Sequence, residues 1–438
     1  MGQLRHKCHE PSSNHVEKQL TAPSERMRIA YIANYQGPAL LKRRPIVGNL
    51  SLAANVKIGL VAELLRNKLH SVEILSQGEV IEHAFKFYPG FQEPELFDEN
   101  IPVHYGAAFP LKFVNGVASS TSLLQIFKAR HQVAPFDMMI IYNVKPAQLL
   151  CANYAIRCLR LPVILEYEDD AFVSVAGKTE SGFRARLNLF VVRNLFNLVS
   201  GCIGVSPHLL RQLPPSIPKL LLRGVVSDEI ANATKPAIIA RKNRIVFSGT
   251  LFETKGVEQL IQAWTMVGLP DWELHIAGDG NLRDRLHRLA AEGRGIVFHG
   301  LLDRLENARL LCSAKIAINP HDVSETPGNV FAFKIVEYLA AGAHVISTRM
   351  GALDPALEGG ITYMPDNKAE TIATTLKQVI GSCSYERNAS RAALQTYGPQ
   401  TVANSLDNLV MELESRRNNS DGASVALSSR GARAIPKG

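Results

Sequence analysis

Residues 244–256 read RIVFSGTLFETKG, and this stretch indicates the fold of the second half of the chain. The apolar run at 245–247 predicts a buried strand, and the chain then passes Gly249 before a helix begins at Gly256. Glycine permits close backbone approach, and a helix N-terminus attracts anions. The stretch predicts a ligand loop in which Lys255 meets a diphosphate; a plain strand–helix joint with a surface lysine is the alternative.

The alternation of short strands and helices continues in both directions. Strands are predicted at 28–33, 72–75, 138–142, 163–167 and 202–205, the last closing a first sheet, and then at 244–247, 272–277, 296–298, 314–318 and 344–346. This pattern predicts an α/β fold with parallel sheets covered by helices. Two successive units of this kind place a ligand cleft at the carboxyl ends of their strands.

Composition suggests where the domains divide. Residues 1–26 and 417–438 are polar and without pattern, so we expect disordered tails there. A Pro-rich stretch at 214–218, together with residues 228–243, brackets the expected connection between domains. The predicted units are an N-terminal domain at 27–215, a C-terminal domain at 216–397 and a last helix at 398–416.

Overall composition is that of an ordinary globular protein. The chain has 438 residues, 46% hydrophobic and 20% charged, which is enough for two cores. The net charge of +8 suits phosphates or acidic lipids without selecting either, and nothing else supports nucleic acid as a partner. Six scattered cysteines without metal-ligand spacing, and no apolar stretch long enough to span a bilayer, predict a soluble, cytoplasmic protein.

Three further joints carry residues suited to a phosphate or a sugar. Gly278 and Gly300 follow predicted strands, although tight turns explain such glycines equally well. A polar loop runs into a helix at about 330–341, where Glu337 lies off the apolar stripe. Its carboxylate could take two ribose hydroxyls, or it could be a solvated or Lys334-paired helix charge. The amides of Gly328, Asn329 and Val330 could hold a phosphate, with Asn329 as a plain N-cap the alternative.

The order and content of these regions resemble glycosyltransferase family 4, or glycosyl transferases group 1, whose members have the GT-B fold. The matching pieces are Gly249 with Lys255-Gly256, Gly278-Asp279-Gly280, Phe298-His299-Gly300 and the helix ending Glu337-Tyr338-Leu339-Ala340-Ala341-Gly342. The likeness covers about 28–414 in layout and is specific from about 245 to 354. It implies two Rossmann-like domains facing across a cleft, with the last helix returning to the N-terminal domain.

The resemblance also implies the chemistry. A sugar would move from a nucleotide diphosphate sugar to an acceptor with retention, and Lys255 and helix-terminal amides would meet the leaving-group charge without a metal or cofactor. Lys255, Asn329 and Glu325 are the candidate catalytic residues. Glu337 would hold the ribose, and main-chain groups near Gly300 and Leu301 the base. The full donor set is Gly249, Thr250, Gly278, Gly300, Leu301, Gly328, Val330 and Glu337.

This chain departs from the family pattern at three positions. A basic residue usually follows the first glycine, but Thr250 stands here, so one positive charge is missing. The residue eight before Glu337 is Asn329 rather than an acid; either Asn329 contacts the sugar, which we prefer, or Glu325 does. Many members carry a histidine where Asn143 ends a strand.

The acceptor side is expected in the N-terminal half. Gly48 and Asn49 lie in the loop that approaches donor and acceptor in the family, and Glu168 and Asp169 resemble its acidic strand end, with capping of the next helix as the alternative. Together with Asn143 they form the predicted acceptor face. Residues 183–199 mix arginines with apolar residues, which suits either contact with anionic lipid or packing on the sheet.

The resemblance leaves substrate and reaction partly open. The acceptor would be a saccharide or a lipid-linked molecule in polysaccharide or glycolipid assembly, with peripheral contact at the inner face of the membrane. A nucleotide-sugar epimerase of the GT-B type is a second reading. A non-catalytic nucleotide-sugar-binding partner subunit is a third, which the residues at Thr250 and Asn143 keep open.

Overall fold

The first sheet has eight strands, seven of them parallel. The computed structural model describes residues 26–44, 52–80, 85–96, 101–111, 114–172, 183–234, 241–292, 295–323, 333–351, 353–382 and 387–431. The strand order is β3-β4-β2-β1-β5-β6-β7-β8, and only β3 is antiparallel to its neighbour. The strands are β1 (Arg28–Ile32), β2 (Ser71–Ser76), β3 (Phe91–Leu96), β4 (Ile101–Tyr105), β5 (Met138–Tyr142), β6 (Val163–Tyr167), β7 (Gly201–Gly204) and β8 (Lys219–Leu221).

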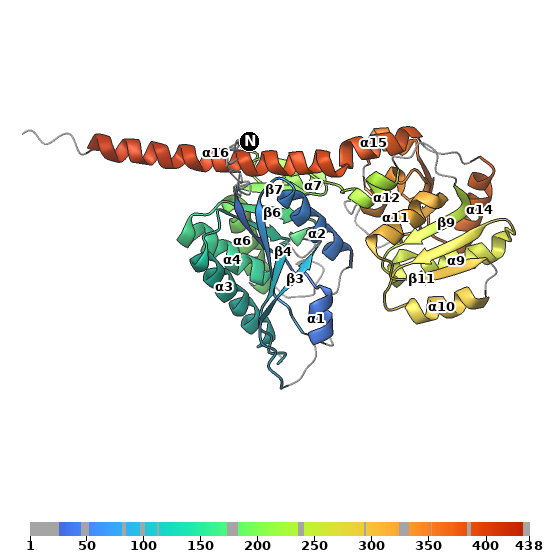
Figure 1. Ribbon diagram of the computed structural model, residues 1–438, viewed down its shortest axis with the longest axis horizontal. Helices are drawn as coiled ribbons and strands as arrows, with labels where there is room; N and C mark the ends of the chain where they lie inside the picture. The colour runs from blue at the N-terminus through green and yellow to red at the C-terminus, as the bar shows by residue number, and fades with distance from the viewer. Residues whose placement is uncertain are drawn as a thin grey trace, which may run out of the picture.

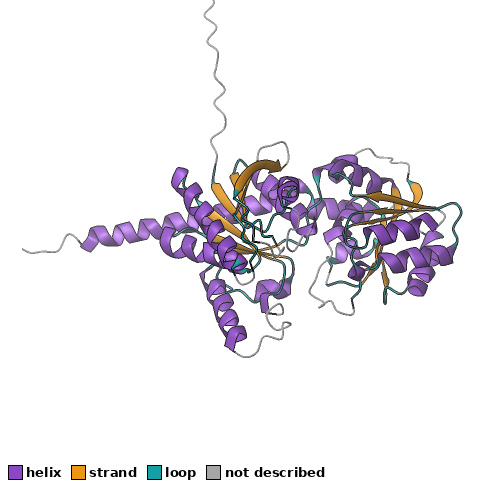
Figure 2. Ribbon diagram, turned by 90° about the horizontal axis from the view of Figure 1, so that it is seen from below, coloured by secondary structure: helices purple, strands orange, loops and turns teal. Residues whose placement is uncertain are grey.

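Helices cover both faces of this sheet (Figures 1 and 2). They are α1 (Pro38–Arg43), α2 (Leu52–Arg66), α3 (Asn115–Val133), α4 (Pro146–Leu159), α6 (Phe183–Leu198) and α7 (Pro207–Arg211). The central strands β5 and β6 are fully buried and, apart from Glu166 of β6, consist of hydrophobic residues, as is typical of strands covered on both faces. Proline at the first turn starts α4, and Ser206 caps α7 by accepting from the amide of Leu209.

The second sheet has six parallel strands in the order β11-β10-β9-β12-β13-β14. They are β9 (Lys242–Ser248), β10 (Glu273–Ala277), β11 (Ile296–Gly300), β12 (Ala314–Asn319), β13 (His344–Thr348) and β14 (Ile361–Met364). The helical elements are α8 (Asp228–Ala233), the short 3-10 helix η1 (Glu253–Lys255), α9 (Val257–Val267), α10 (Arg283–Glu292), α11 (Arg304–Ser313), α12 (Phe333–Ala340), α13 (Pro355–Glu358), α14 (Ala369–Ile380) and α15 (Arg387–Tyr397).

Each sheet separates two hydrophobic cores, one on either face. The two α/β domains predicted from the alternating pattern are therefore confirmed. The chain passes from the first core to the second between Val225 and Val226. It returns through α16 (Pro399–Gly431), which follows α15 of the second domain. Residues of α16 from Val402 to Leu413 pack into the first core, and Figure 1 shows this helix leaving α15, crossing the first domain and extending beyond it.

Three details differ from the sequence prediction. The strand at 201–204 does not close the first sheet, because β8 pairs with it in parallel and places residues 219–221 beyond the expected boundary at 215. The backbone is helical as far as Gly431, so the unpatterned residues from 417 to 431 continue α16 rather than form a disordered tail. The expected N-terminal tail, 1–25, lies outside the described residues.

Candidate active site

The carboxyl ends of strands from both sheets meet at one cavity of about 460 Å³. The first domain contributes α2 and the residues that end β5 and β6, and the second contributes the ends of β9, β10 and β12 with one face of α12. Nine predicted site residues line it: Asn143, Glu168, Asp169, Gly249, Thr250, Lys255, Gly278, Leu301 and Glu337. This is the position expected for a ligand in facing open α/β sheets.

Glycines at the ends of adjacent strands shape the second-domain wall. The amide of Gly249 donates to the carbonyl oxygen of Ala277 at 3.0 Å, and that of Gly278 donates to Gly300 at 2.8 Å. Gly249 and Gly278 have φ values of +153° and +142°, which side-chain-bearing residues rarely adopt. A β-carbon at Gly278 would lie 1.8 Å from the carbonyl oxygen of Gly249. The two loops therefore approach each other only because both residues are glycine.

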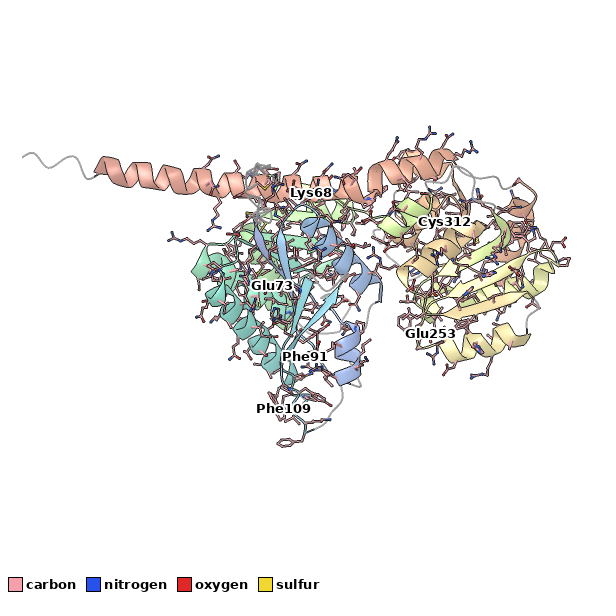
Figure 3. All side chains as sticks on the ribbon, viewed as in Figure 1. Lys68, Glu73, Phe91, Phe109, Glu253 and Cys312 are labelled. Carbon is pink, nitrogen blue, oxygen red and sulfur yellow. The ribbon has the colours of Figure 1, made fainter. Side chains whose placement is uncertain are left out.

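Lys255 ends η1 on the wall of the cavity, and Figure 3 places Glu253 of the same short helix on the side of the second domain that faces the first. Its Nζ lies 3.3 Å from Nδ1 of His321. Burial lowers the pKa of Lys255. Burial, followed by the charges of Lys255 and Lys334, lowers the pKa of His321 to about 4. An ammonium only donates, so the neutral imidazole accepts at Nδ1 and orients Lys255. The hydroxyl of Thr348 holds the His321 carbonyl at 2.7 Å.

Glu337 lies on the same helix as a second lysine, Lys334, and both line the cavity. Burial raises the pKa of Glu337 to about 7, and the charges of Arg304 and Lys334 offset part of that rise. No ion pair joins Lys334 and Glu337 in the described part of the chain, so a simple helix-surface pair does not account for this carboxylate. A desolvated carboxylate facing a cavity is suited to binding hydroxyl groups.

Asn143 organises the first-domain wall. It has a φ of +59°, and its side chain is buried. Its Oδ1 accepts from the amides of Glu168 and Asp169 at 2.8 and 3.0 Å, and its Nδ2 donates to Oδ2 of Asp169 at 2.8 Å. The carboxylate that accepts a hydrogen bond from the next turn of backbone, from the amide of Phe172, belongs to Asp170 and not to Glu168 or Asp169. Asn143 thus holds the carboxylate of Asp169 directly and, through the backbone amide, the residue Glu168.

A buried lysine, Lys57 of α2, completes this wall. Its Nζ bonds to Glu168 and lies 3.3 Å from Oε1 of Glu166. Tyr142 donates to the other oxygen of Glu168 at 2.6 Å. Sequence reasoning missed Lys57 and His321 and considered Lys334 only as a possible partner of Glu337, because nothing in their local pattern separates them from ordinary helix and loop residues. A usable signal exists for two of them: His321 closely follows a predicted strand end, and Lys334 lies on the same helix as Glu337.

Arg304 joins the two domains beside the cavity. Its guanidinium lies 3.1 Å from Glu63 of α2 and 3.1 Å from Glu229 of α8.

Six predicted site residues lie outside the described residues and stay predictions: Gly48, Asn49, Glu325, Gly328, Asn329 and Val330. The described residues contain no group of three or more His, Cys, Asp or Glu placed to hold a metal ion. They also contain no helix that is long and apolar enough to cross a membrane.

Comparison with known proteins agrees with this architecture. Residues 242–382 match the sequence profile of the family described as glycosyl transferases group 1. A GDP-mannose-dependent alpha-(1-6)-phosphatidylinositol dimannoside mannosyltransferase of Mycobacterium tuberculosis is 32% identical over 138 residues, or 31% of this chain and 35% of that relative. The matched segment is therefore about a third of that relative's length. A phosphatidyl-myo-inositol mannosyltransferase of the same organism is 24% identical over 79% of this chain and 89% of its own length.

Solved structures show the same fold over nearly the whole chain. Sucrose-phosphate synthase from Thermosynechococcus elongatus superposes with a TM-score of 0.62 at 16% identity, covering 89% of this chain and 100% of that one. Anabaena HepE in complex with UDP and glucose gives a TM-score of 0.57 at 16% identity, covering 88% and 100%.

Two Rossmann-like domains with a cavity between their strand ends define the GT-B class of proteins, and this chain has that fold. The part of the chain that matches the family described as glycosyl transferases group 1, residues 242–382, contains Gly249, Lys255 and Glu337.

Proposed function

We propose that this protein transfers a sugar from a nucleoside diphosphate sugar to a hydroxyl group of an acceptor. The observation that carries the proposal is that Lys255, the strand-end glycines and Glu337 line one cavity with Asn143, Glu168 and Asp169 of the other domain. The second domain offers a cation and a carboxylate for a nucleoside diphosphate, beside glycines that let a ligand approach the backbone closely. The first offers two positioned carboxylates for acceptor hydroxyls. The match of residues 242–382 to glycosyl transferases group 1 supports the donor side of this proposal.

The proposed reaction retains the configuration at the anomeric carbon. The bond between that carbon and the β-phosphate oxygen breaks, and its electron pair stays on the diphosphate. The acceptor oxygen bonds to the same face of the sugar, and its proton passes to the departing diphosphate. Lys255 opposes the charge that develops on the leaving group, in a buried site where such charges act strongly. Because a protein cation performs this task, we propose that the transfer needs no metal ion.

The named relatives suggest the substrates to try first. One is described as GDP-mannose-dependent, and both act on phosphatidylinositol-containing molecules according to their names. We propose a glycolipid acceptor for this chain, with GDP-mannose as the first donor to test. A lipid-linked acceptor would bring the protein into peripheral contact with the cytoplasmic face of a membrane.

A ligand screen followed by product analysis tests the proposed function. Thermal midpoints are measured with UDP-, GDP- and ADP-linked sugars, and the stabilising donor is then incubated with and without phosphatidylinositol-containing vesicles. We expect one donor to stabilise the protein, and nucleoside diphosphate to be released with a labelled glycolipid when acceptor is present. Absence of stabilisation by every donor contradicts the proposal. Conversion of the nucleotide sugar to its epimer without acceptor supports the epimerase instead, and binding without turnover supports the partner subunit.

A further inference from the structure

We propose that Lys334 supplies the second positive charge of the diphosphate site, in place of the basic residue that the family usually carries where this chain has Thr250. The inference rests on the proposed function, since it concerns the group that grips the donor's diphosphate. The second positive charge would then come from α12, whereas the family pattern predicts it at the end of β9.

The position of the ammonium is the first argument. A β-carbon built on Gly249 would lie 2.7 Å from Nζ of Lys334 and 3.3 Å from its Cε. The Nζ also lies 4.2 Å from the ring centroid of Phe247, two residues earlier in β9. The ammonium therefore occupies the space that glycine leaves at the carboxyl end of the strand. Thr250, which stands where the family usually carries a basic residue, directly follows Gly249 and lines the same cavity as Lys334.

The second argument is that this buried cation lacks an anionic partner. Lys334 Nζ is covered from solvent and makes no hydrogen bond within the described residues. No carboxylate of those residues lies within ion-pair distance of it either. Buried charges in proteins are normally paired and hydrogen-bonded, because an isolated one is costly. An anionic ligand in the cavity, which Lys334 lines, would supply the partner.

The charges around Lys334 point the same way. Burial lowers its pKa to about 7, with a further contribution from the charge of Lys255. His321 faces both lysines and stays neutral near pH 7, so it adds no positive charge and cannot act as an anionic partner. Among the described residues, the charge of Glu337 raises the pKa of Lys334, and the pKa of Glu337 is itself raised to about 7 by burial. Two lysines thus share a cavity wall with little opposing charge, an arrangement that a diphosphate bridging them would relieve.

Calorimetric binding of ligands that differ only in phosphate content tests the inference. The ligands are the nucleoside diphosphate that binds the wild-type protein most tightly and its parent nucleoside. Lys334→Met and Lys334→Gln remove the charge and keep most of the stem. We expect each variant to weaken diphosphate binding by about tenfold to a hundredfold, because that is the usual contribution of a charge-assisted hydrogen bond. Nucleoside binding should weaken by less than about threefold. Lys334→Arg and the double variant Lys334→Met/Thr250→Arg should recover most of the diphosphate affinity.

Lys315→Met is the matched control. Lys315 also lies over an aromatic ring, at 5.7 Å from the centroid of Trp272, and bonds to Asn243 at 2.6 Å. It stands near the start of β12, away from the cavity, so both affinities should stay at the wild-type values.

If folded Lys334→Met binds the diphosphate within twofold of wild type while Lys255→Met does not, the inference is wrong and the proposed function stands. If both ligands weaken equally, Lys334 is only structural. If the wild-type protein binds no nucleoside diphosphate, both proposals fail.

Discussion

The hydroxyl of Tyr338 makes two hydrogen bonds to the backbone of Ser248. It accepts from the amide at 2.9 Å and donates to the carbonyl oxygen at 2.8 Å. Tyr338 belongs to α12 and is fully buried, whereas Ser248 ends β9 directly before Gly249. One phenol therefore joins the helix that carries Lys334 and Glu337 to the strand end that carries the glycine loop.

Tyr338→Phe should loosen this connection. The change removes the hydroxyl and leaves two backbone groups of Ser248 without their partner, at a cost of about 1–3 kcal/mol in the free energy of unfolding. We also expect donor affinity to fall, because Gly249 and Glu337 no longer keep a fixed separation. Chemical denaturation and donor titration check the two effects. Tyr363→Phe is the control, since Tyr363 lies on β14, away from the cavity lining. Unchanged stability and affinity in Tyr338→Phe would show that the connection has no energetic role.

Lys255→Ala should lower turnover much more than it lowers stability. Its ammonium is the charge assigned to the leaving diphosphate, and losing one such group costs about 10²–10³-fold in kcat. His321→Ala should have a smaller effect of the same kind, because His321 positions Lys255 rather than touching the donor. Steady-state kinetics and thermal midpoints check this, with the exposed Lys368→Ala as control. Wild-type turnover in Lys255→Ala would contradict the leaving-group role assigned to Lys255.

The strands of the central sheets could be read from the sequence because they are short apolar runs. Residues 138–142 and 163–167 were predicted with the bounds that β5 and β6 have, since strands buried on both faces contain little else. The hairpin of β3 and β4 escaped prediction because Pro94 and Pro102 interrupt its pattern. The helical stretch beyond residue 416 escaped because it has no apolar face to reveal it.

Some residues of the candidate site could likewise be predicted from the sequence, and others could not. Gly249, Lys255 and Gly278 were found because their role depends on a strand–loop–helix joint that is local in sequence. Lys334 was seen only as a partner of Glu337, since its contact with Gly249 joins residues 85 apart in the numbering and requires α12 to pack beside β9. Arg304 likewise gains its role from Glu63 of the other domain. Local sequence reasoning has no access to such pairs.

Glu337→Gln should reduce the preference for ribose while stabilising the free protein at alkaline pH. Since the folded-state pKa is raised from 4.5 to about 7, Glu337 contributes stability that is full below pH 4.5 and is lost as the pH rises through 7. The thermal midpoint of Glu337→Gln, relative to that of the wild-type protein, should therefore rise as the pH is raised from 5 to 8. Affinity for a nucleoside diphosphate should fall by about tenfold, but affinity for its 2′,3′-dideoxy analogue should change little. An equal loss for both would contradict ribose binding.

Activity should survive removal of divalent ions. Lys255, with Lys334 in the proposed arrangement, places positive charge where a metal ion would otherwise stand, so treatment with EDTA followed by assay in metal-free buffer should leave kcat within about twofold of the untreated value. Manganese added back should change it no further. Complete loss on chelation, with recovery on adding manganese, would show that the lysines do not suffice and that the transfer depends on a metal.

Diphosphate binding should weaken as the pH rises above neutrality. Burial and the neighbouring Lys255 lower the pKa of Lys334 to about 7, so the free protein loses this charge in the range where an anion needs it. Between pH 7.5 and 9 the terminal phosphate is already ionised, since its last pKa is about 6, and binding must then take up a proton at Lys334. Wild-type affinity should fall by up to about tenfold per pH unit. Lys334→Arg stays charged and should show a flatter profile; a slope as steep as that of wild type would assign the titration to Lys255 instead.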